Sequence, residues 1–103
     1  IILSVCVIAP VFEELFFRGF ILQALKRHGN VFAIITTSIL FALLHGNLVQ
    51  AIPVFALSIV ISYSVIRTNN VLIGILIHFL NNSLSIFELF LCEKCLLFQL
   101  YFY

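Results

Sequence analysis

Two adjacent glutamates, Glu13 and Glu14, lie inside a long apolar run at the start of the chain. Arg18 follows the second glutamate by four residues in the same run. Ionisable side chains are expensive inside a segment that crosses a membrane, so they need partners there or a part in a reaction. The run therefore indicates either a buried polar network or a reaction site.

The composition of the chain is that of a membrane protein. Of its 103 residues, 64% are hydrophobic and 9% are charged, whereas a soluble globular domain has about 45–50% apolar and about 25% charged residues. A small domain has too much surface to hide this much apolar side chain from water. The net charge is +1 without a basic run, so we expect a lipid bilayer around the protein and no nucleic acid as a partner.

Other composition features concern the limits of the chain and its cysteines. The chain has no methionine and begins with Ile1, so we expect it to be the core part of a larger protein. Cys92 and Cys95 have the spacing of half a zinc site, but no second pair follows, which makes metal binding there a weak hypothesis. A disulfide or an incidental pair is the better interpretation.

Polar or glycine-containing breaks divide the chain into four apolar segments. A membrane-spanning helix needs about 20 apolar residues, so the first and last segments are long enough alone, and the middle two reach that length with their flanks. Strands of a membrane barrel alternate apolar and polar residues, and these segments do not. We therefore predict an all-α, polytopic membrane helical bundle with about four transmembrane helices, located as a multi-pass protein in the cell membrane. The predicted helices cover about residues 1–27, 31–47, 50–66 and 71–91, and residues 92–103 form an apolar tail of unknown role.

Polar side chains recur at helical spacing in three of these segments. Glu14 and Arg18 are four residues apart, so they share a helix face and can form an ion pair. Glu13 is rotated from Glu14 by about 100°, which leaves it free to face a cavity. The other pairs at the same spacing are Phe41 with His45 and His78 with Asn82.

Each of these residues also has a structural interpretation. A single histidine in a membrane helix often forms a hydrogen bond between helices, and for His45 or His78 alone this explains the residue as well as catalysis does. For Glu14 and Arg18 a structural ion pair is favoured. The combination that favours a functional site is Glu13, His45, His78 and Asn82.

With these motifs the chain resembles the CPBP (or ABI) family of intramembrane peptidases, which includes CAAX prenyl endopeptidases and bacteriocin-processing or self-immunity proteins. The first motif of that family is a pair of glutamates with an arginine four residues after the second. The second is a phenylalanine followed by a histidine four residues later, and the third is a histidine followed by an asparagine at the same spacing. The resemblance covers about residues 9–83. The candidate site residues at the matching positions are Glu13, Glu14, Arg18, His45, His78 and Asn82. The second motif also includes Phe41.

The resemblance implies an intramembrane endopeptidase core over residues 1–91, acting on a CAAX-type prenylated protein or on a bacteriocin leader or immunity peptide. Glu13, assisted by His45, would activate the water that attacks the peptide carbonyl. His78 and Asn82 would donate hydrogen bonds to the oxyanion. The neighbouring ion pair would hold the helix that carries the glutamate base.

Two alternatives stay open at this point. A zinc ion held by Glu13, His45 and His78 would leave an open coordination position for water, although the metal-free mechanism is favoured and no cofactor is required by the residues. The other alternative is a membrane module without catalytic activity, which binds a peptide or a partner protein as a bacteriocin self-immunity protein does. In that case the motifs only hold the bundle together.

Overall fold

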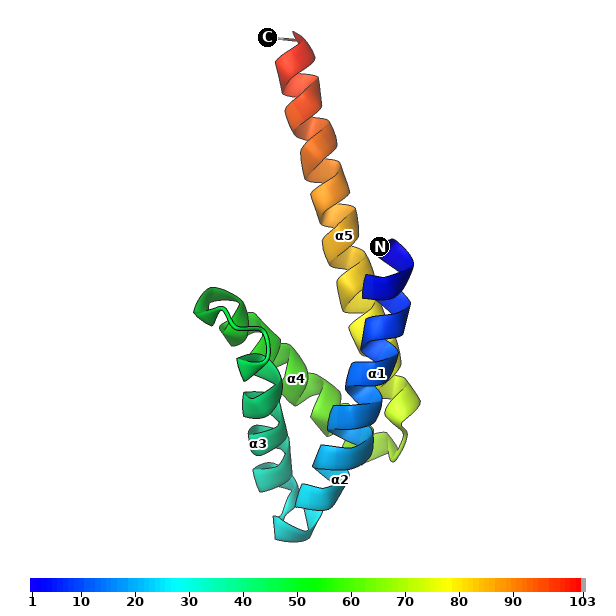
Figure 1. Ribbon diagram of the computed structural model, residues 1–103, viewed down its shortest axis with the longest axis vertical. Coiled ribbons are helices and arrows are strands. Elements are labelled where there is room, and N and C mark those ends of the chain that lie inside the picture. Colours follow the sequence, from blue (N-terminus) through cyan, green and yellow to red (C-terminus); the bar gives the residue numbers. More distant parts are fainter. Residues whose placement is uncertain (103) are drawn as a thin grey trace.

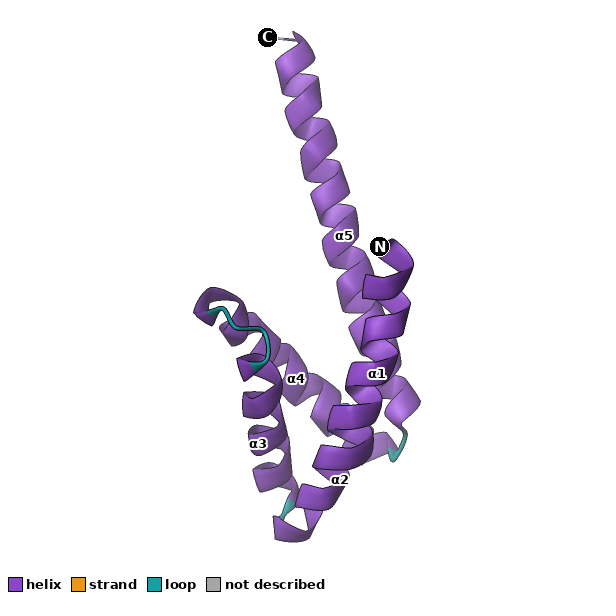
Figure 2. Ribbon diagram, viewed as in Figure 1, coloured by secondary structure: helices purple, strands orange, loops and turns teal. Residues whose placement is uncertain are grey.

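The computed structural model describes residues 1–102, which are helical except at the short connections and contain no strand (Figure 1, Figure 2). The prediction of an all-α helical bundle is confirmed. The first helical run lies against the beginning of the last helix, and the two middle helices form a hairpin beside them (Figure 1).

The first helical run contains two π-helical segments. Helix α1 carries both glutamates, and Pro10 lies in its first turn, where a missing backbone N–H is tolerated. The run ends at Gly29, whose φ of 108° is unfavourable for any residue with a Cβ atom. In order, the run consists of η1 (Ser4–Ile8, π), α1 (Ala9–Phe16), η2 (Phe17–Ile21, π), α2 (Leu22–Leu25) and η3 (Lys26–His28, a 3₁₀ turn).

The three following helices differ from the predicted ones mainly at their ends. Helix α3 spans Asn30–Leu43 and stops four residues before the predicted end at 47, because the chain turns at Gly46 with a φ of 64°. Helix α4 spans Leu48–Thr68, and the Asn47 side chain accepts a hydrogen bond from the backbone at its first turn. Helix α5 spans Val71–Phe102. It therefore continues without a break through most of the stretch that was predicted as a separate tail.

Two of these helices, α4 and α5, are long and apolar enough to cross a membrane. Helix α3 is apolar but has only 14 residues, and the first run is divided by its π-helical segments. Only 22% of the most apolar window of α4 and 6% of that of α5 are buried inside the protein. Most of their apolar surface therefore faces outward, as it does in helices surrounded by lipid.

The interior of the bundle is apolar at one end and polar in the middle. The apolar part is formed by Leu22, Ala33, Ile61 and Val65, which bring together the first run, α3 and α4. Small residues let membrane helices approach closely, and α3 and α4 each contribute two buried hydroxyl side chains to the interior. The polar side chains buried in the centre are Glu14, Arg18, Thr37, Ser38, Ser58, Ser62 and His78.

Candidate active site

The predicted ion pair between Glu14 and Arg18 is present at the centre of the bundle. Nη1 of Arg18 lies 3.1 Å from Oε1 of Glu14, and both side chains are fully buried. A buried charge that loses its partner destabilises a protein strongly. We therefore expect the first helical run to be stable in the bundle only while both charges are present.

Helix α4 supplies the remaining partners of Arg18. Its Nη2 atom donates to the backbone carbonyl of Ser58 at 3.1 Å and to the hydroxyl of the same residue. Its Nε atom donates to the hydroxyl of Ser62 at 3.3 Å. The sequence analysis assigned no role to either serine. The signal that could have revealed these contacts is their own four-residue spacing, which places two hydroxyl groups on one face of α4.

His78 of α5 bridges the two glutamates. Its Nδ1 atom lies 2.8 Å from Oε1 of Glu14. A carboxylate oxygen only accepts hydrogen bonds, so Nδ1 carries the proton and a neutral ring has Nε2 free as an acceptor. This Nε2 atom lies 3.7 Å from Oε2 of Glu13, which is too long for a direct hydrogen bond.

The two adjacent glutamates consequently have opposite environments. The side chain of Glu14 is fully buried, whereas that of Glu13 is 39% exposed. Oε1 of Glu14 is occupied by an arginine and an imidazole. Glu13 keeps its carboxylate open at the edge of the same network, so it can receive a water molecule or a substrate group.

Gly74 of α5 lies close to the carboxylate of Glu14 and leaves no room for a side chain. A Cβ atom at this position would lie 3.0 Å from Oε2 of Glu14 and 3.0 Å from a methyl group of Val65. Ordinary van der Waals contacts of a Cβ atom begin at 3.4 Å. The absence of a side chain at Gly74 therefore allows α5 to approach closely enough for His78, one turn later, to reach Glu14.

Phe41 of α3 connects the three sequence motifs. Its buried ring lies 5.0 Å from that of Phe17 and 5.7 Å from that of His78, measured between centroids. The guanidinium of Arg18 lies over the same ring at 4.6 Å, a favourable arrangement for a cation and an aromatic face. Phe41 thus closes the polar network on the side of α3.

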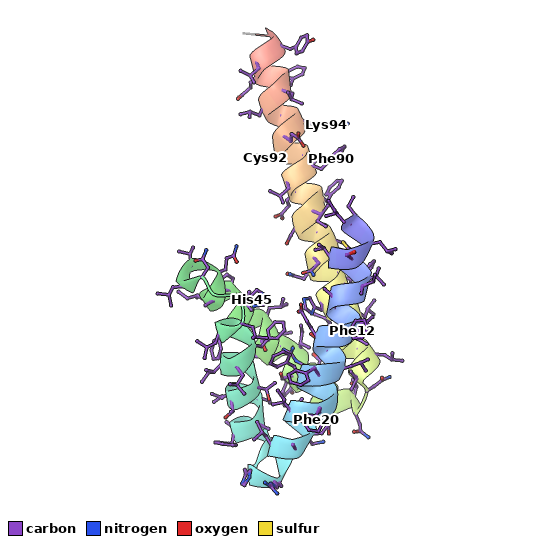
Figure 3. All side chains as sticks on the ribbon, in the orientation of Figure 1. Phe12, Phe20, His45, Phe90, Cys92 and Lys94 are labelled. Atoms are coloured by element: carbon purple, nitrogen blue, oxygen red, sulfur yellow. The ribbon has the colours of Figure 1, made fainter. Side chains whose placement is uncertain are left out.

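The remaining two predicted site residues lie farther from the carboxylates. Asn82 is one turn beyond His78, and its Nδ2 atom donates to the carbonyl of Val5 at 3.0 Å. His45 lies in the turn that follows α3 (Figure 3), where its Nδ1 atom is 3.1 Å from the carbonyl of Phe41. Among residues 1–102, no hydrogen bond or ion pair joins His45 to either glutamate.

The same geometry bears on the zinc alternative. Within the described part of the chain, no three histidine, cysteine, aspartate or glutamate side chains are grouped closely enough to hold one metal ion. The set Glu13, His45 and His78 therefore does not fit a metal centre in this arrangement. Cys92 and Cys95 are both free and exposed, so they do not form the disulfide considered from the sequence.

Comparison with known proteins places the chain in a family. The model of the type II CAAX prenyl endopeptidase Rce1-like family matches residues 1–84, which include every motif residue of the site. Neither the curated proteins nor the solved structures contain a match. Members of the matching family are membrane-embedded proteases. The fold, the three motifs and the extent of this match together show that the chain belongs to the Rce1-like family of CAAX-type intramembrane endopeptidases.

Proposed function

We propose that this protein hydrolyses a peptide bond of a prenylated protein within the membrane, by means of a water molecule that Glu13 activates. The observation that carries the proposal is the contrast between the two adjacent glutamates. Glu14 is buried and paired, while Glu13 is open and lies 3.7 Å from the Nε2 atom of His78. A multi-pass position in the cell membrane would hold this site at a depth where bulk water is scarce.

The chemistry follows from the two acceptor atoms that face each other. A water molecule near Oε2 of Glu13 and Nε2 of His78 can donate one hydrogen bond to each, which leaves its lone pair for the peptide carbonyl carbon. Glu13 takes a proton from the water as the new C–O bond forms. It then returns that proton to the amine of the leaving peptide as the C–N bond breaks.

The structure supports His78 as the helper of Glu13 better than His45. His78 is oriented by Glu14, which fixes the protonated nitrogen on the far side of the ring. His45 is oriented by the carbonyl of Phe41, and its Nε2 atom is also free to accept a hydrogen bond. Because His45 is not bonded to either glutamate within residues 1–102, we propose that it binds the substrate peptide and does not activate the water.

Asn82 is the candidate donor to the oxyanion. A carboxamide nitrogen has two N–H groups, and one of those of Asn82 is used by the carbonyl of Val5. The second N–H remains for the negatively charged oxygen of the tetrahedral intermediate. Loss of one such donor costs about 100–1,000-fold in kcat.

The deciding experiment is the cleavage of a fluorogenic prenylated peptide by the full-length protein, purified in detergent, with Glu13→Gln as the variant. Removal of a general base lowers kcat by about 100–10,000-fold, and we expect the amount of folded protein and its Tm to stay unchanged. Glu93→Gln, on the exposed part of α5, is the matched control and should keep full activity. Full cleavage by Glu13→Gln would contradict the proposal.

The same assay addresses zinc and the alternative without catalysis. We expect cleavage to persist in the presence of a strong chelator, because the described residues do not group three ligands. Loss of activity with chelator and its return with zinc would require a rearranged site. A folded protein that binds the peptides without cleaving any of them would instead support the binding module.

A further inference from the structure

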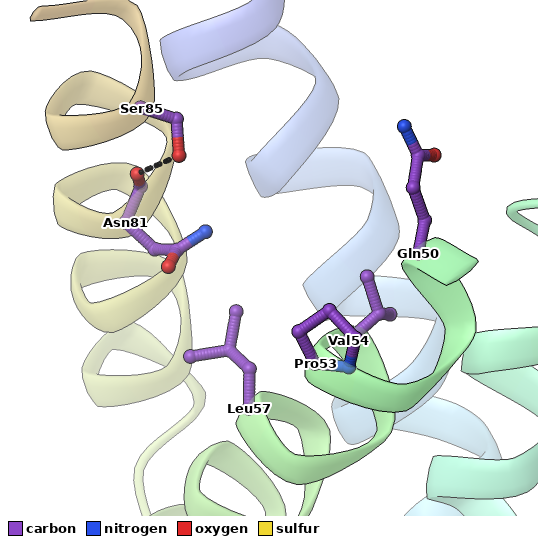
Figure 4. A pocket seen from close by; sticks show the side chains of 6 residues that line it. All are labelled: Gln50, Pro53, Val54, Leu57, Asn81 and Ser85. Atoms are coloured by element: carbon purple, nitrogen blue, oxygen red, sulfur yellow. Dashed lines mark hydrogen bonds between the residues drawn. The ribbon is translucent and has the colours of Figure 1, made fainter. Parts of the chain in front are cut away.

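Helix α4 carries none of the three sequence motifs, yet it supplies most of the hydrogen-bond acceptors of Arg18. The guanidinium donates to the hydroxyl and the backbone carbonyl of Ser58 and to the hydroxyl of Ser62. Both serine side chains are fully buried. Another face of the same helix, with Pro53 and Leu57, borders a pocket beside α5 (Figure 4). The face with the two serines is therefore the part of α4 that belongs to the buried network.

The ion pair between Arg18 and Glu14 uses only one of the two carboxylate oxygens. Nη1 of Arg18 lies 3.1 Å from Oε1 of Glu14, whereas the buried Oε2 atom has no hydrogen-bond partner within residues 1–102. An arginine and a carboxylate frequently pair through two parallel hydrogen bonds, and a buried acceptor that lacks a partner costs free energy. We therefore expect an unrestrained guanidinium to bind both oxygens of Glu14.

The two serines restrain the guanidinium of Arg18 in the geometry with one bond. A guanidinium forms two parallel bonds to a carboxylate through Nη2 together with either Nη1 or Nε. Here Nη2 donates to Ser58, and Nε donates to Ser62 at 3.3 Å. Both pairs of nitrogens are thus partly occupied by α4, and only Nη1 is left for Glu14.

The restraint extends to His78 because one oxygen of Glu14 serves both residues. Oε1 accepts from Nη1 of Arg18 and lies 2.8 Å from Nδ1 of His78. A pair with two parallel bonds is planar, so a guanidinium that bound both oxygens would turn the carboxylate with it. Oε1 would then leave Nδ1, and the imidazole would lose the bond that keeps its Nε2 atom free as an acceptor beside Glu13.

We infer that Ser58 and Ser62 are positioning residues of the reaction, which hold Arg18 so that Glu14 can orient His78. The inference rests on the proposed function, in which Nε2 of His78 binds the attacking water. It adds α4 to the helices that set the geometry of the site. The serines act through two other side chains and not on the substrate, so they affect the rate of the chemical step and not the binding of the peptide.

The test measures the His78 ring and the rate of cleavage in the same full-length variants. NMR of protein labelled with nitrogen-15 in its imidazole rings reports which ring nitrogen carries the proton, and the signals lost in His78→Gln identify that residue. Cleavage of the fluorogenic prenylated peptide gives kcat and KM. The variants are Ser58→Ala, Ser62→Ala and the two combined.

Two further serines provide matched controls. Ser38→Ala removes a hydroxyl of α3 that is equally buried but has no hydrogen-bond partner within residues 1–102. Ser64→Ala removes a hydroxyl of α4 that donates to a carbonyl of its own helix at 2.7 Å. Both variants should give the His78 spectrum and the kcat of the reference protein.

We expect the combined variant to lower kcat by about 10–100-fold, the value of a hydrogen bond to a charged group, with KM nearly unchanged. The nitrogen-15 signals of His78 should shift, because Nδ1 loses its fixed acceptor. Ser58→Thr and Ser62→Thr keep the hydroxyl groups and should recover most of the kcat that the alanine variants lose. Cysteine, which fills a similar space but is only a weak acceptor, replaces alanine if an alanine variant has a lowered Tm.

Two results would overturn the positioning role. One is a folded combined variant with the His78 spectrum and the kcat of the reference protein. The other is an equal loss of kcat in Ser38→Ala, which would mean that removal of any buried hydroxyl is sufficient. If the serine variants shift the His78 signals but the reference protein cleaves no peptide, the positioning role is supported and the peptidase proposal fails.

Discussion

Helix α5 contains two largely apolar parts that have very different surroundings. Up to Asn82 it packs against the first helical run, with Gly74 and His78 buried and the Asn82 amide bonded to a backbone carbonyl. From Leu84 to Tyr101 nearly every residue is exposed, and the helix projects alone from the bundle (Figure 1). The family match ends at residue 84, where the packed part ends.

This difference shows what determines packing in an apolar chain. In a bilayer a leucine gains little by leaving lipid for another helix, so association depends on close packing and on polar contacts. The packed part of α5 presents glycine, histidine and asparagine at four-residue intervals on one face. The projecting part is also largely apolar, but it carries Glu88, Glu93 and Lys94, and its side chains are nearly all exposed.

The largest effect is expected at the centre of the packed part. Arg18→Ala removes the charge that matches Glu14 and leaves the hydroxyl groups of α4 without a donor. The loss of one partner of a buried ion pair costs about 3–5 kcal/mol. We expect little folded protein in membranes, measured as abundance and Tm in detergent.

Arg67→Ala is the control for this change, because Arg67 is exposed in the last turn of α4. It should have a normal Tm. Equal behaviour of the two variants would mean that the buried network does not hold the packed part together.

The next effect concerns the close approach of α5. Gly74→Ala places a Cβ atom 3.0 Å from Oε2 of Glu14 and from a methyl group of Val65. Overpacking of this kind costs about 1–3 kcal/mol. We expect a lower Tm and, because His78 is displaced from Glu14, a lower kcat at a similar KM.

Gly19→Ala is the matched substitution, since its nearest atom would be a backbone oxygen at 4.0 Å. It should leave kcat unchanged. A Gly74→Ala protein with the kcat of the Gly19→Ala protein would show that the spacing of α5 does not set the position of His78.

The smallest effect is expected when an apolar residue is shortened in each of the two parts of α5. Ile77 packs against the apolar core, whereas Leu97 is exposed. In lipid the lost packing rather than water transfer determines the cost, so Ile77→Ala should lower the free energy of unfolding by about 1 kcal/mol, below the range for fully buried sites. Leu97→Ala should change it by less than about 0.5 kcal/mol. A comparable loss at Leu97, measured by unfolding in mixed micelles, would mean that the projecting part has a partner.

The spacing of residues within single helices was enough to predict several features of this molecule. The helical class and the Glu14–Arg18 pair follow from composition and from a four-residue interval within one helix, and both are confirmed. The shared face of His78 and Asn82 follows in the same way. Such predictions need only the geometry of a single helix.

The contacts between helices could not be predicted in this way. The bond from His78 to Glu14 and those from Arg18 to Ser58 and Ser62 join residues that are 40 or more positions apart. They depend on crossing angles and on how closely two helices approach, which a single sequence does not specify. The end of α3 was also placed too late, because a glycine turn at Gly46 competes with an apolar pattern that continues past it.

The length of α5 makes its two exposed cysteines useful as natural reporters of topology. Its 32 residues extend over about 48 Å at 1.5 Å per residue, whereas the hydrocarbon layer is about 30 Å thick. If Val71 lies at one boundary of that layer, Cys92 and Cys95 (Cys92 is labelled in Figure 3) come about 32 Å and 36 Å along the axis, at or beyond the opposite boundary. A thiol reagent that does not cross membranes would then label them from one side only, and so identify the compartment toward which α5 points.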